Sequence, residues 1–279
     1  MESVVKSLFR YWLLASLIPC AASAESYVVG VEKAEFEPYF TVDQQGSYRG
    51  FSRDLLDLFA RDAGIELTYK PVEPANLLDE LLTGRVDLKY PDSPYWAKDL
   101  KAGRNLSYSG DIVAFIDGVM VAPSRLGKNI QLLKRLAVVK GWTPEQYREA
   151  IGSGHITRVD NGSLRELIRG TLKQQADGAY YNVEVAIHYL NYRSSSPNAL
   201  VFDPSLPYSR GTYQLSTLKH PQLVERFNRF LGEHRQEVEA LKSKYRVEEN
   251  ISSEFLGMEQ WKVDFIKRQR AKEQAAKNG

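Results

Sequence analysis

Cysteine is almost absent from this chain of 279 residues, because Cys20 is its only one. One thiol cannot form a disulfide within a chain, and Cys20 lies in a segment that we expect to be removed. The mature chain is therefore predicted to have no disulfide, no thiol nucleophile and no cysteine-based metal site. The four histidines do not show the H-x-H or H-E-x-x-H spacing of metal ligands, so no metal is predicted.

An excess of one charge is also lacking, since 37 Lys and Arg stand against 35 Asp and Glu. This balance disfavours a nucleic-acid partner. The basic C-terminal stretch, residues 267–279, alternates with Glu and Ala and is typical of a solvated helix end rather than an RNA-binding tail.

Catalytic motifs are lacking as well. The sequence contains no G-x-S-x-G nucleophile elbow and no G-x-x-x-x-G-K-[ST] phosphate loop. Carboxylates are plentiful, but no spacing among them indicates an acid–base pair. We therefore predict no catalytic residue and no cofactor, and we expect that the protein is not an enzyme.

Apolar runs near twenty residues are lacking, and the longest one opens the chain. Lys6 and Arg10 precede the mostly apolar residues Tyr11–Ala22, and Ala22-Ser23-Ala24 follows. This pattern predicts a signal peptide, residues 1–24, cleaved after Ala24, and hence export to the periplasm. The apolar run is too short for a membrane anchor. Leu17–Cys20 weakly resembles a lipoprotein box, which the proline before the cysteine fits poorly.

Short apolar strands alternate with amphipathic helices along the rest of the chain, which predicts an α/β fold. The expected strands are 27–31, 65–69, 86–90, 119–122, 136–139, 156–159, 178–181, 200–202 and 212–216. The expected helices are 51–63, 76–82, one opened by Thr143 as N-cap and Pro144, one capped by Ser163, 183–190 and a long one, 221–241.

This order predicts two lobes with a cleft between them. Residues 25–119 would form lobe 1, residues 120–206 lobe 2, and residues 207–279 a return to lobe 1 with C-terminal helices. Two extended connectors near Val119–Ala122 and Leu200–Phe202 would act as hinges. Ligands bind at the carboxyl ends of strands in such sheets. The stretch DLKYPDSPYW, Asp87–Trp96, follows such an end and carries charged and aromatic side chains.

Several short motifs resemble, in order and spacing, those of the periplasmic solute-binding proteins of ABC transporters, family 3, the polar amino-acid type. Phe36 and Pro38-Tyr39 follow the first strand, and Gly50–Asp54 begins the first helix. Residues 81–88, LLTGRVDL, match a Leu-x-x-Gly-x-x-Asp-Leu signature. Tyr108-Ser109, Gly141–Thr143 and residues 176–179 resemble further motifs, so that the resemblance extends over nearly the whole mature chain.

The resemblance implies a type II-like periplasmic-binding-protein fold that closes its two lobes over a small polar solute. It also implies an ABC permease as partner, and we expect a monomer. In the family an aromatic residue at the position of Phe36 stacks on the solute. Helix N-termini of the second lobe offer N–H groups to a carboxylate, where Gly141–Thr143 stands here.

The sequence departs from the family pattern at the positions that choose the solute. Small residues of lobe 1 are replaced by Lys89, Tyr90, Asp92 and their neighbours, and Asn182 replaces the aspartate that grips an amine. No arginine stands at the expected offset, so Lys98, Lys101 and Arg104 are candidates to replace it. The predicted ligand-binding residues are Phe36, Tyr39, Lys89, Tyr90, Asp92, Ser93, Tyr95, Trp96, Gly141, Trp142, Thr143, Asn182 and Glu184.

Two questions stay open at this point. Lys89 and Asp92 could face the solute, with Asp92 or Glu184 taking its ammonium group, or they could pair with each other. The same clamp could also serve as a sensory module that reports to a membrane receptor. A dehydratase or lyase on the same fold is a third reading, with Asp92 and Glu184 as its suspected acid–base groups.

Overall fold

The computed structural model describes residues 24–194, 196–249, 251 and 260–277. The predicted signal peptide falls almost wholly on residues 1–23, outside this part. The strands are β1 (Ser26–Glu32), β2 (Glu35–Phe36), β3 (Phe40–Val42), β4 (Tyr48–Arg49), β5 (Glu66–Val72), β6 (Leu88–Asp92), β7 (Ser107–Tyr108), β8 (Val113–Val121), β9 (Arg135–Val139), β10 (Thr157–Asn161), β11 (Gly178–Asn182), β12 (Val201–Phe202) and β13 (Ser209–Thr217).

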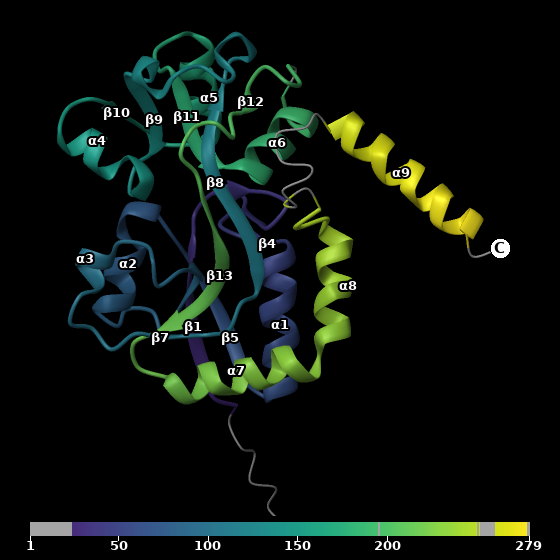
Figure 1. Cartoon of the computed structure of the whole chain (residues 1–279). Coiled ribbons are helices and arrows are strands. Elements are labelled where there is room, and N and C mark those ends of the chain that lie inside the picture. Colours follow the sequence, from purple (N-terminus) through teal and green to yellow (C-terminus); the bar gives the residue numbers. More distant parts are fainter. Residues whose placement is uncertain (1–23, 195, 250, 252–259, 278–279) are drawn as a thin grey trace, which may run out of the picture.

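Helices flank these strands, as the alternating pattern predicts (Figure 1). They are α1 (Phe51–Ala63), α2 (Pro74–Leu82), α3 (Lys98–Lys101), α4 (Arg148–Gly152), α5 (Leu164–Leu172), α6 (Val183–Tyr192), α7 (Pro221–Glu233), α8 (Arg235–Tyr245) and α9 (Gln260–Lys277). Three short 3-10 turns, Pro123–Arg125, Ile130–Leu132 and Glu145–Tyr147, complete the chain.

One continuous sheet joins the two lobes, in the order β10-β9-β11-β8-β13-β6-β1-β5. The outer strands at each end are parallel, whereas β8 and β13 are antiparallel to each other and to their other neighbours. Figure 1 shows β8 and β13 running side by side from the lower lobe into the upper one. These two long strands are therefore the covalent connection between the lobes.

The segments in which β8 and β13 pass from one lobe to the other differ from the predicted connectors. Residues 113–117 of β8 pair with residues 213–209 of β13, in the stretch between the lobes. The segments predicted as hinges instead pair with each other inside lobe 2, with Val201 opposite Val121 and Phe202 opposite Met120. We therefore propose that bending occurs in residues 113–118 and 208–213.

Local sequence explains where several elements begin and end. Gly64 ends α1 with φ 63°, and its N–H donates to the carbonyls of Ala60 and Arg61. Ser163 caps α5 by accepting the Glu166 N–H, as predicted. The long helix predicted over 221–241 is wrong, because it breaks at His234, which has φ −104° and ψ 31°. The His234 ring lies 3.0 Å from Asp62 at the end of α1, and α7 and α8 both pack on α1.

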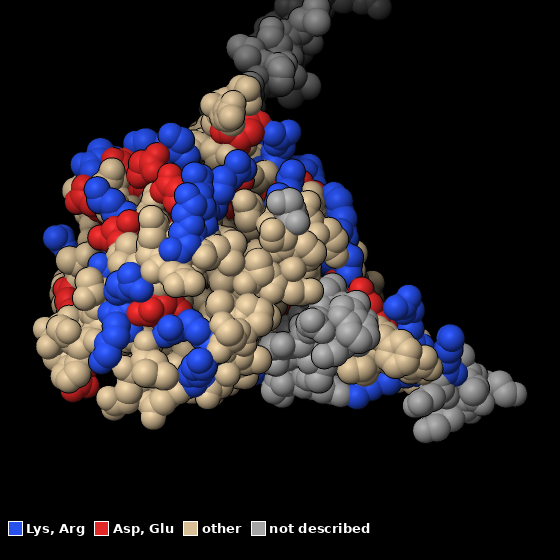
Figure 2. Space-filling view, turned by 90° about the horizontal axis from the view of Figure 1, so that it is seen from above, with Lys and Arg blue, Asp and Glu red and all other residues tan. Residues whose placement is uncertain are grey.

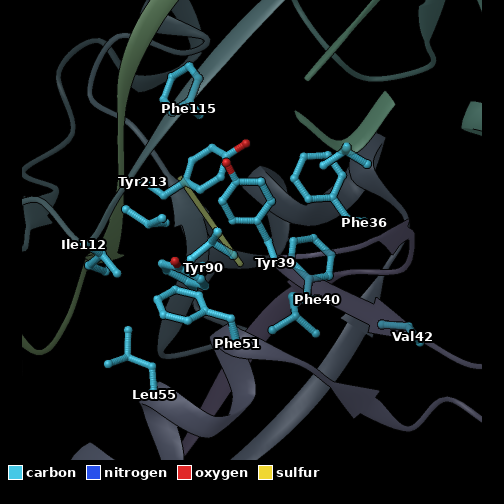
Figure 3. Close-up of a cluster of buried hydrophobic side chains, with 14 of the residues drawn as sticks. Phe36, Tyr39, Phe40, Val42, Phe51, Leu55, Tyr90, Ile112, Phe115 and Tyr213 are labelled. Atoms are coloured by element: carbon cyan, nitrogen blue, oxygen red, sulfur yellow. The ribbon is translucent and has the colours of Figure 1, made fainter. Parts of the chain in front are cut away.

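The first lobe has a core rich in aromatic rings. Figure 3 shows Tyr39 among Phe36, Phe40 and Tyr213, which comes from β13, with Phe51 below them. Tyr213 stacks on Phe115 at 4.7 Å and meets Tyr39 edge-on at 5.3 Å. Because these rings come from β2, α1, β8 and β13, their packing holds β8 and β13 against the core of lobe 1.

The surface carries both signs of charge. On the face in Figure 2, lysine and arginine side chains are interspersed with aspartates and glutamates around a broad area that has neither. Among the described residues, no helix is long and apolar enough to cross a membrane.

Candidate ligand-binding cleft

The candidate site is a cleft between the two lobes, open at its mouth, with a cavity volume of about 100 Å³. Strand ends build it: Glu32 is the last residue of β1, Asp92 the last of β6, and Gly141 follows β9 by two residues. This cavity volume is below the roughly 300–1,000 Å³ that is typical of small-molecule pockets, so the lobes leave little free space between them in this structure. Of the predicted ligand-binding residues, seven line it together, namely Phe36, Lys89, Asp92, Trp96, Gly141, Trp142 and Thr143.

Asp92 lies between two lysines on the lobe 1 wall. Its Oδ1 is 3.0 Å from the Nζ of Lys89 and 2.8 Å from the Nζ of Lys101. The same oxygen accepts the Ser93 N–H at 2.8 Å, and Oδ2 accepts the Ser216 hydroxyl at 2.7 Å. Burial raises the pKa of Asp92, but attraction to the two lysines outweighs it and lowers the pKa. The aspartate is therefore ionised and fully occupied by protein partners.

The two lysines leave one positive charge in excess over Asp92. Lys89 also donates to the Pro91 carbonyl at 2.7 Å, and Lys101 to the Ser93 carbonyl at 2.7 Å. An ammonium group has three N–H donors. Lys101 uses two of them, on Asp92 and the Ser93 carbonyl, and Lys89 uses one, on the Pro91 carbonyl, so each lysine keeps at least one. Both lysines line the cleft. This lysine cluster (Lys89, Asp92, Lys101) can therefore receive an anionic group from a solute.

Two further carboxylates, Glu32 and Asp117, line the same cleft without an ion pair among the described residues. Both residues are buried, and 8% of the surface of each is exposed. Burial raises the pKa of Glu32, against attraction to Lys89 and a hydrogen bond from Trp142. Burial and repulsion from Glu32 raise the pKa of Asp117 to about 7, against a hydrogen bond from Asn182. We call these two residues the acid pair.

Aromatic rings form the walls between the lysine cluster and the acid pair. Phe36 meets Trp142 edge-on at 5.8 Å, and Trp96 meets Tyr213 edge-on at 5.7 Å. The Lys89 Nζ lies 5.7 Å above the Trp96 ring. Ring faces attract cations and exclude water. The aromatic walls therefore strengthen the attraction of a charged solute to the lysine cluster and to the acid pair.

Six predicted ligand-binding residues do not line the cleft. Tyr95 is exposed, with 68% of its surface accessible, and Ser93 contributes its backbone to the lysine cluster. Tyr90 is buried in the lobe 1 core, where its hydroxyl has no hydrogen-bond partner among the described residues. The other three, Tyr39, Asn182 and Glu184, hold neighbouring structure in place.

Glu184 forms a contact between the two lobes and does not line the cleft. Its Oε2 accepts the Tyr39 hydroxyl at 2.5 Å and the Glu248 N–H at 3.3 Å. Burial raises its pKa to about 7, against the hydrogen bond from Tyr39. The role considered for Glu184 as partner of a solute ammonium, or as an acid–base group, is therefore not supported by its position.

Asn182 positions Tyr213 and a helix. Its side-chain oxygen accepts the Val185 N–H at 3.0 Å and thereby caps α6, and its Nδ2 donates to the Tyr213 hydroxyl at 2.9 Å. Both ends of the amide have partners, and the residue is wholly buried. Asn182 thus acts through Tyr213, which lines the cleft.

The helix N-terminus expected at Gly141–Thr143 is wrong. Pro144 has ψ 83°, outside the helical range, and the 3-10 turn Glu145–Tyr147 follows. Tyr147 is buried and donates its hydroxyl to the Pro207 carbonyl at 2.8 Å, which holds the turn in this form. The five-residue helix α4 begins only at Arg148, so Thr143 caps no helix and the anion site predicted there has no helix dipole behind it.

Of the three candidates to replace the family's arginine, Lys101 alone lines the cleft. Lys98 lies 5.2 Å above the ring of Tyr95, and Arg104 is exposed. Sequence reasoning missed Glu32, Asp117 and Tyr213. Glu32 could have been found by the strand-end rule that pointed to Asp92, whereas Asp117 and Tyr213 lie within long strands.

The lobes touch each other on both sides of the cleft. A Cβ added to Gly141 of lobe 2 would lie 2.4 Å from the Cα of Ala75 in lobe 1. Arg193 of α6 pairs with Glu37 at 2.8 Å, and Arg148 pairs with Asp99. The described residues contain no group of three or more His, Cys, Asp or Glu that could hold a metal ion.

Comparison with known proteins supports this description of the fold. Residues 27–94 match the model of bacterial extracellular solute-binding proteins, family 3. No curated protein matches the sequence. Many solved structures match the fold, so that the chain has the mixed α/β, type II periplasmic-binding-protein fold that the resemblance implied.

Three of these solved structures illustrate the range of the fold. A substrate-binding protein of an ABC uptake transporter from Streptococcus pneumoniae, with bound histidine, is 19% identical with a TM-score of 0.64, over 79% of this chain and 92% of that one. A histidine kinase sensor domain is 17% identical with a TM-score of 0.67, over 80% and 96%. An ancestral amino acid-binding protein, a precursor of cyclohexadienyl dehydratase, is 19% identical with a TM-score of 0.62, over 79% and 95%.

Removing the charge of Asp92 should destabilise the protein strongly. Asp92→Asn leaves two buried lysines without their carboxylate, which should cost about 3–5 kcal/mol of unfolding free energy. Asp79→Asn is the matched control, because Asp79 pairs with Arg85 at the surface and 66% of its side chain is exposed; it should cost less than about 1 kcal/mol. Urea unfolding at pH 7 measures both, and equal losses would contradict the buried lysine cluster.

Asp117 should make stability depend on pH. Its folded-state pKa of about 7 exceeds the unfolded value of about 3.9, so the folded state holds an extra proton between these values. This contribution to stability is complete below pH 4 and is lost as the pH rises through 7, by up to about 4 kcal/mol. Asp117→Asn cannot titrate, so relative to wild type it should gain stability from pH 5 to pH 8. A difference in urea unfolding free energy that does not change with pH would contradict this.

Proposed function

We propose that this chain, whose residues 27–94 belong to the bacterial extracellular solute-binding proteins, family 3, captures a small charged, amino-acid-like solute in the periplasm. It would close its lobes over the solute and deliver it to an ABC-type permease. One observation carries the proposal: the cleft between the lobes buries an unsatisfied positive charge at the lysine cluster and unpaired carboxylates at the acid pair.

The energetic argument concerns the cost of these buried charges. Removing an ion from water costs several kcal/mol unless the ion finds a partner. A small solute that carries both an anionic and a cationic group would supply partners to both ends of the cleft at once. An uncharged sugar would leave them unpaired, so the cleft should select against it.

Other features support a binding role over catalysis. Asp92, which was suspected as an acid–base group, is held ionised by two lysines and two further donors. The relative that is a precursor of a dehydratase is itself described as an amino acid-binding protein. A sensory module is the second candidate, because a histidine kinase sensor domain shares the fold. Uptake of labelled solute by cells with and without the gene would distinguish transport from sensing.

A thermal-shift screen tests the proposal. The panel is the twenty L-amino acids and a set of neutral sugars. A bound solute at 100 times its dissociation constant adds about 2.7 kcal/mol to stability, or about 5–10 °C in melting temperature for a chain of this size. We expect a shift of this kind from at least one amino acid. A shift from sugars alone, or from no member of the panel, would refute the proposal.

Closure can be checked on the same ligand with two glycine variants. A side chain at Gly141 would collide with the Ala75 backbone, whereas Gly154 has a similar positive φ of 77° and open space around its Cα. Gly141→Ala should therefore abolish the ligand-induced decrease in radius of gyration in X-ray scattering, and Gly154→Ala should keep it. Loss of compaction in both variants would point to backbone strain instead of closure.

We also propose that residues 1–24 are a signal peptide removed after Ala24. The warrant is the basic start, the short apolar run and the small residues before Glu25. The intact mass of protein recovered from the periplasm should correspond to a chain that begins at Glu25. A mass that includes residues 1–24, or a lipid on Cys20, would contradict this.

A further inference from the structure

The acid pair is the most unusual feature of the cleft. Neither carboxylate has an ion pair among the described residues, although both are buried and line the cavity. Their two strands are not neighbours in the sheet: Glu32 ends β1 of lobe 1, and Asp117 lies on β8, which both lobes share. Two like charges brought together from separate elements repel each other, and either a retained proton or a bound cation offsets this cost.

Resting on the proposed function, we propose that Glu32 and Asp117 form a subsite for a positively charged group, so that the preferred solute is an amino acid with a cationic side chain. Its α-carboxylate would take the remaining N–H donors of Lys89 and Lys101. Its cationic side chain, ammonium or guanidinium, would lie between the acid pair and the aromatic walls.

A count of charges matches this class when every carboxylate of the cleft is ionised. The cleft holds two lysines against Asp92, Glu32 and Asp117, which leaves a net charge of −1 when all three carboxylates are ionised. A cationic amino acid brings two positive charges and one negative, a net of +1. Four positive and four negative groups then face each other within the closed cleft. A neutral amino acid matches the form in which Asp117, whose pKa is about 7, keeps its proton, so the two classes of solute should differ in how their binding depends on pH.

The cleft offers both kinds of charge to one solute. Glu32 is attracted to Lys89 and repels Asp117, so it is within electrostatic range of both. Phe36, Trp142 and Tyr213 line the same cavity. The flat guanidinium or the ammonium group of such a solute can rest on these rings while its charge meets the carboxylates.

The surroundings of Asp117 make this subsite sensitive to pH. At pH 6 most Asp117 side chains hold a proton, because the pKa is about 7. A cation favours the ionised form, so its binding should release a proton and its affinity should rise from pH 6 to pH 8. Titratable and polar groups from three elements surround the acid pair. They are Glu32 and Lys89 of lobe 1, Tyr180, Tyr181 and Asn182 of β11, and Tyr213 of β13.

Calorimetry with paired solutes tests the inference. L-Arginine and L-citrulline have the same shape, and citrulline lacks the charge; L-lysine and L-norleucine form a second pair. In wild type the cationic member of at least one pair should bind about 10- to 100-fold more tightly than its neutral partner. Glu32→Gln and Asp117→Asn should each reduce this preference by about tenfold, and Asp62→Asn, in an exposed pair with His234, should keep it.

Proton release gives a second readout that does not depend on variants. Titrations at pH 6 in two buffers of different ionisation enthalpy should show release of a proton when the cationic amino acid binds. Equal affinity within both pairs, unchanged preference in both acid-pair variants, or no release of protons by wild type would each overturn the inference. If glutamine or another neutral amino acid binds best, the inference fails while the proposed function stands. If no amino acid binds, both fail.

Discussion

The ionised carboxylate of Asp92 is the interaction on which the rest of the cleft depends. It is buried at the carboxyl end of β6, pairs with Lys89, and receives hydrogen bonds from Lys101, one backbone N–H and one hydroxyl. Without it, Lys89 and Lys101 would repel each other in a buried site. With it, the two ammonium groups are fixed within reach of the cleft, and one positive charge remains for a partner.

This arrangement differs in kind from an arginine clamp. A guanidinium offers a planar fork of N–H donors that matches a carboxylate in one fixed geometry. Two ammonium groups held by one aspartate offer two point charges, whose positions are set by the Pro91 and Ser93 carbonyls. The backbone of the loop after β6 therefore decides where an anionic group binds, which gives the proline-rich DLKYPDSPYW stretch a physical role.

How far the sequence could predict this structure depends on the range of the interactions. The α/β alternation, the bounds of α1 and the cap of α5 follow from local patterns, and the structure has them. The strand-end rule pointed to Asp92, and the resemblance to the family pointed to the turn at Gly141. The helix break at His234 was not predictable, because it depends on packing against α1, far away in sequence.

The acid pair shows the same limit more sharply. The strand was predicted to begin at Val119, because Asp117 and Gly118 interrupt the apolar pattern. β8 in fact begins six residues earlier, at Val113. A buried aspartate is unfavourable in an ordinary strand and is tolerated here because it faces the cleft. Tyr39 and Glu184, predicted to touch the solute, instead bind each other across 145 residues of sequence. Such a contact has no local signature in the chain.

The position of Asp117 connects recognition with the movement of the lobes. At Asp117, β8 pairs with Asn182 of β11 on one side and with Ser209 of β13 on the other, where the sheet passes from one lobe to the other. A charge attracted to this residue therefore acts on the strand that must bend when the lobes separate. The lysine cluster belongs to lobe 1 and Trp142 to lobe 2, so a solute that spans the cleft contacts both lobes and the strand between them. Because opposite charges lose their attraction steeply once water enters, opening would expose the lysine cluster, the acid pair and the solute to water together. Under the proposed function, binding and closure would be one electrostatic event, whose strength is set by how many buried charges the solute can pair.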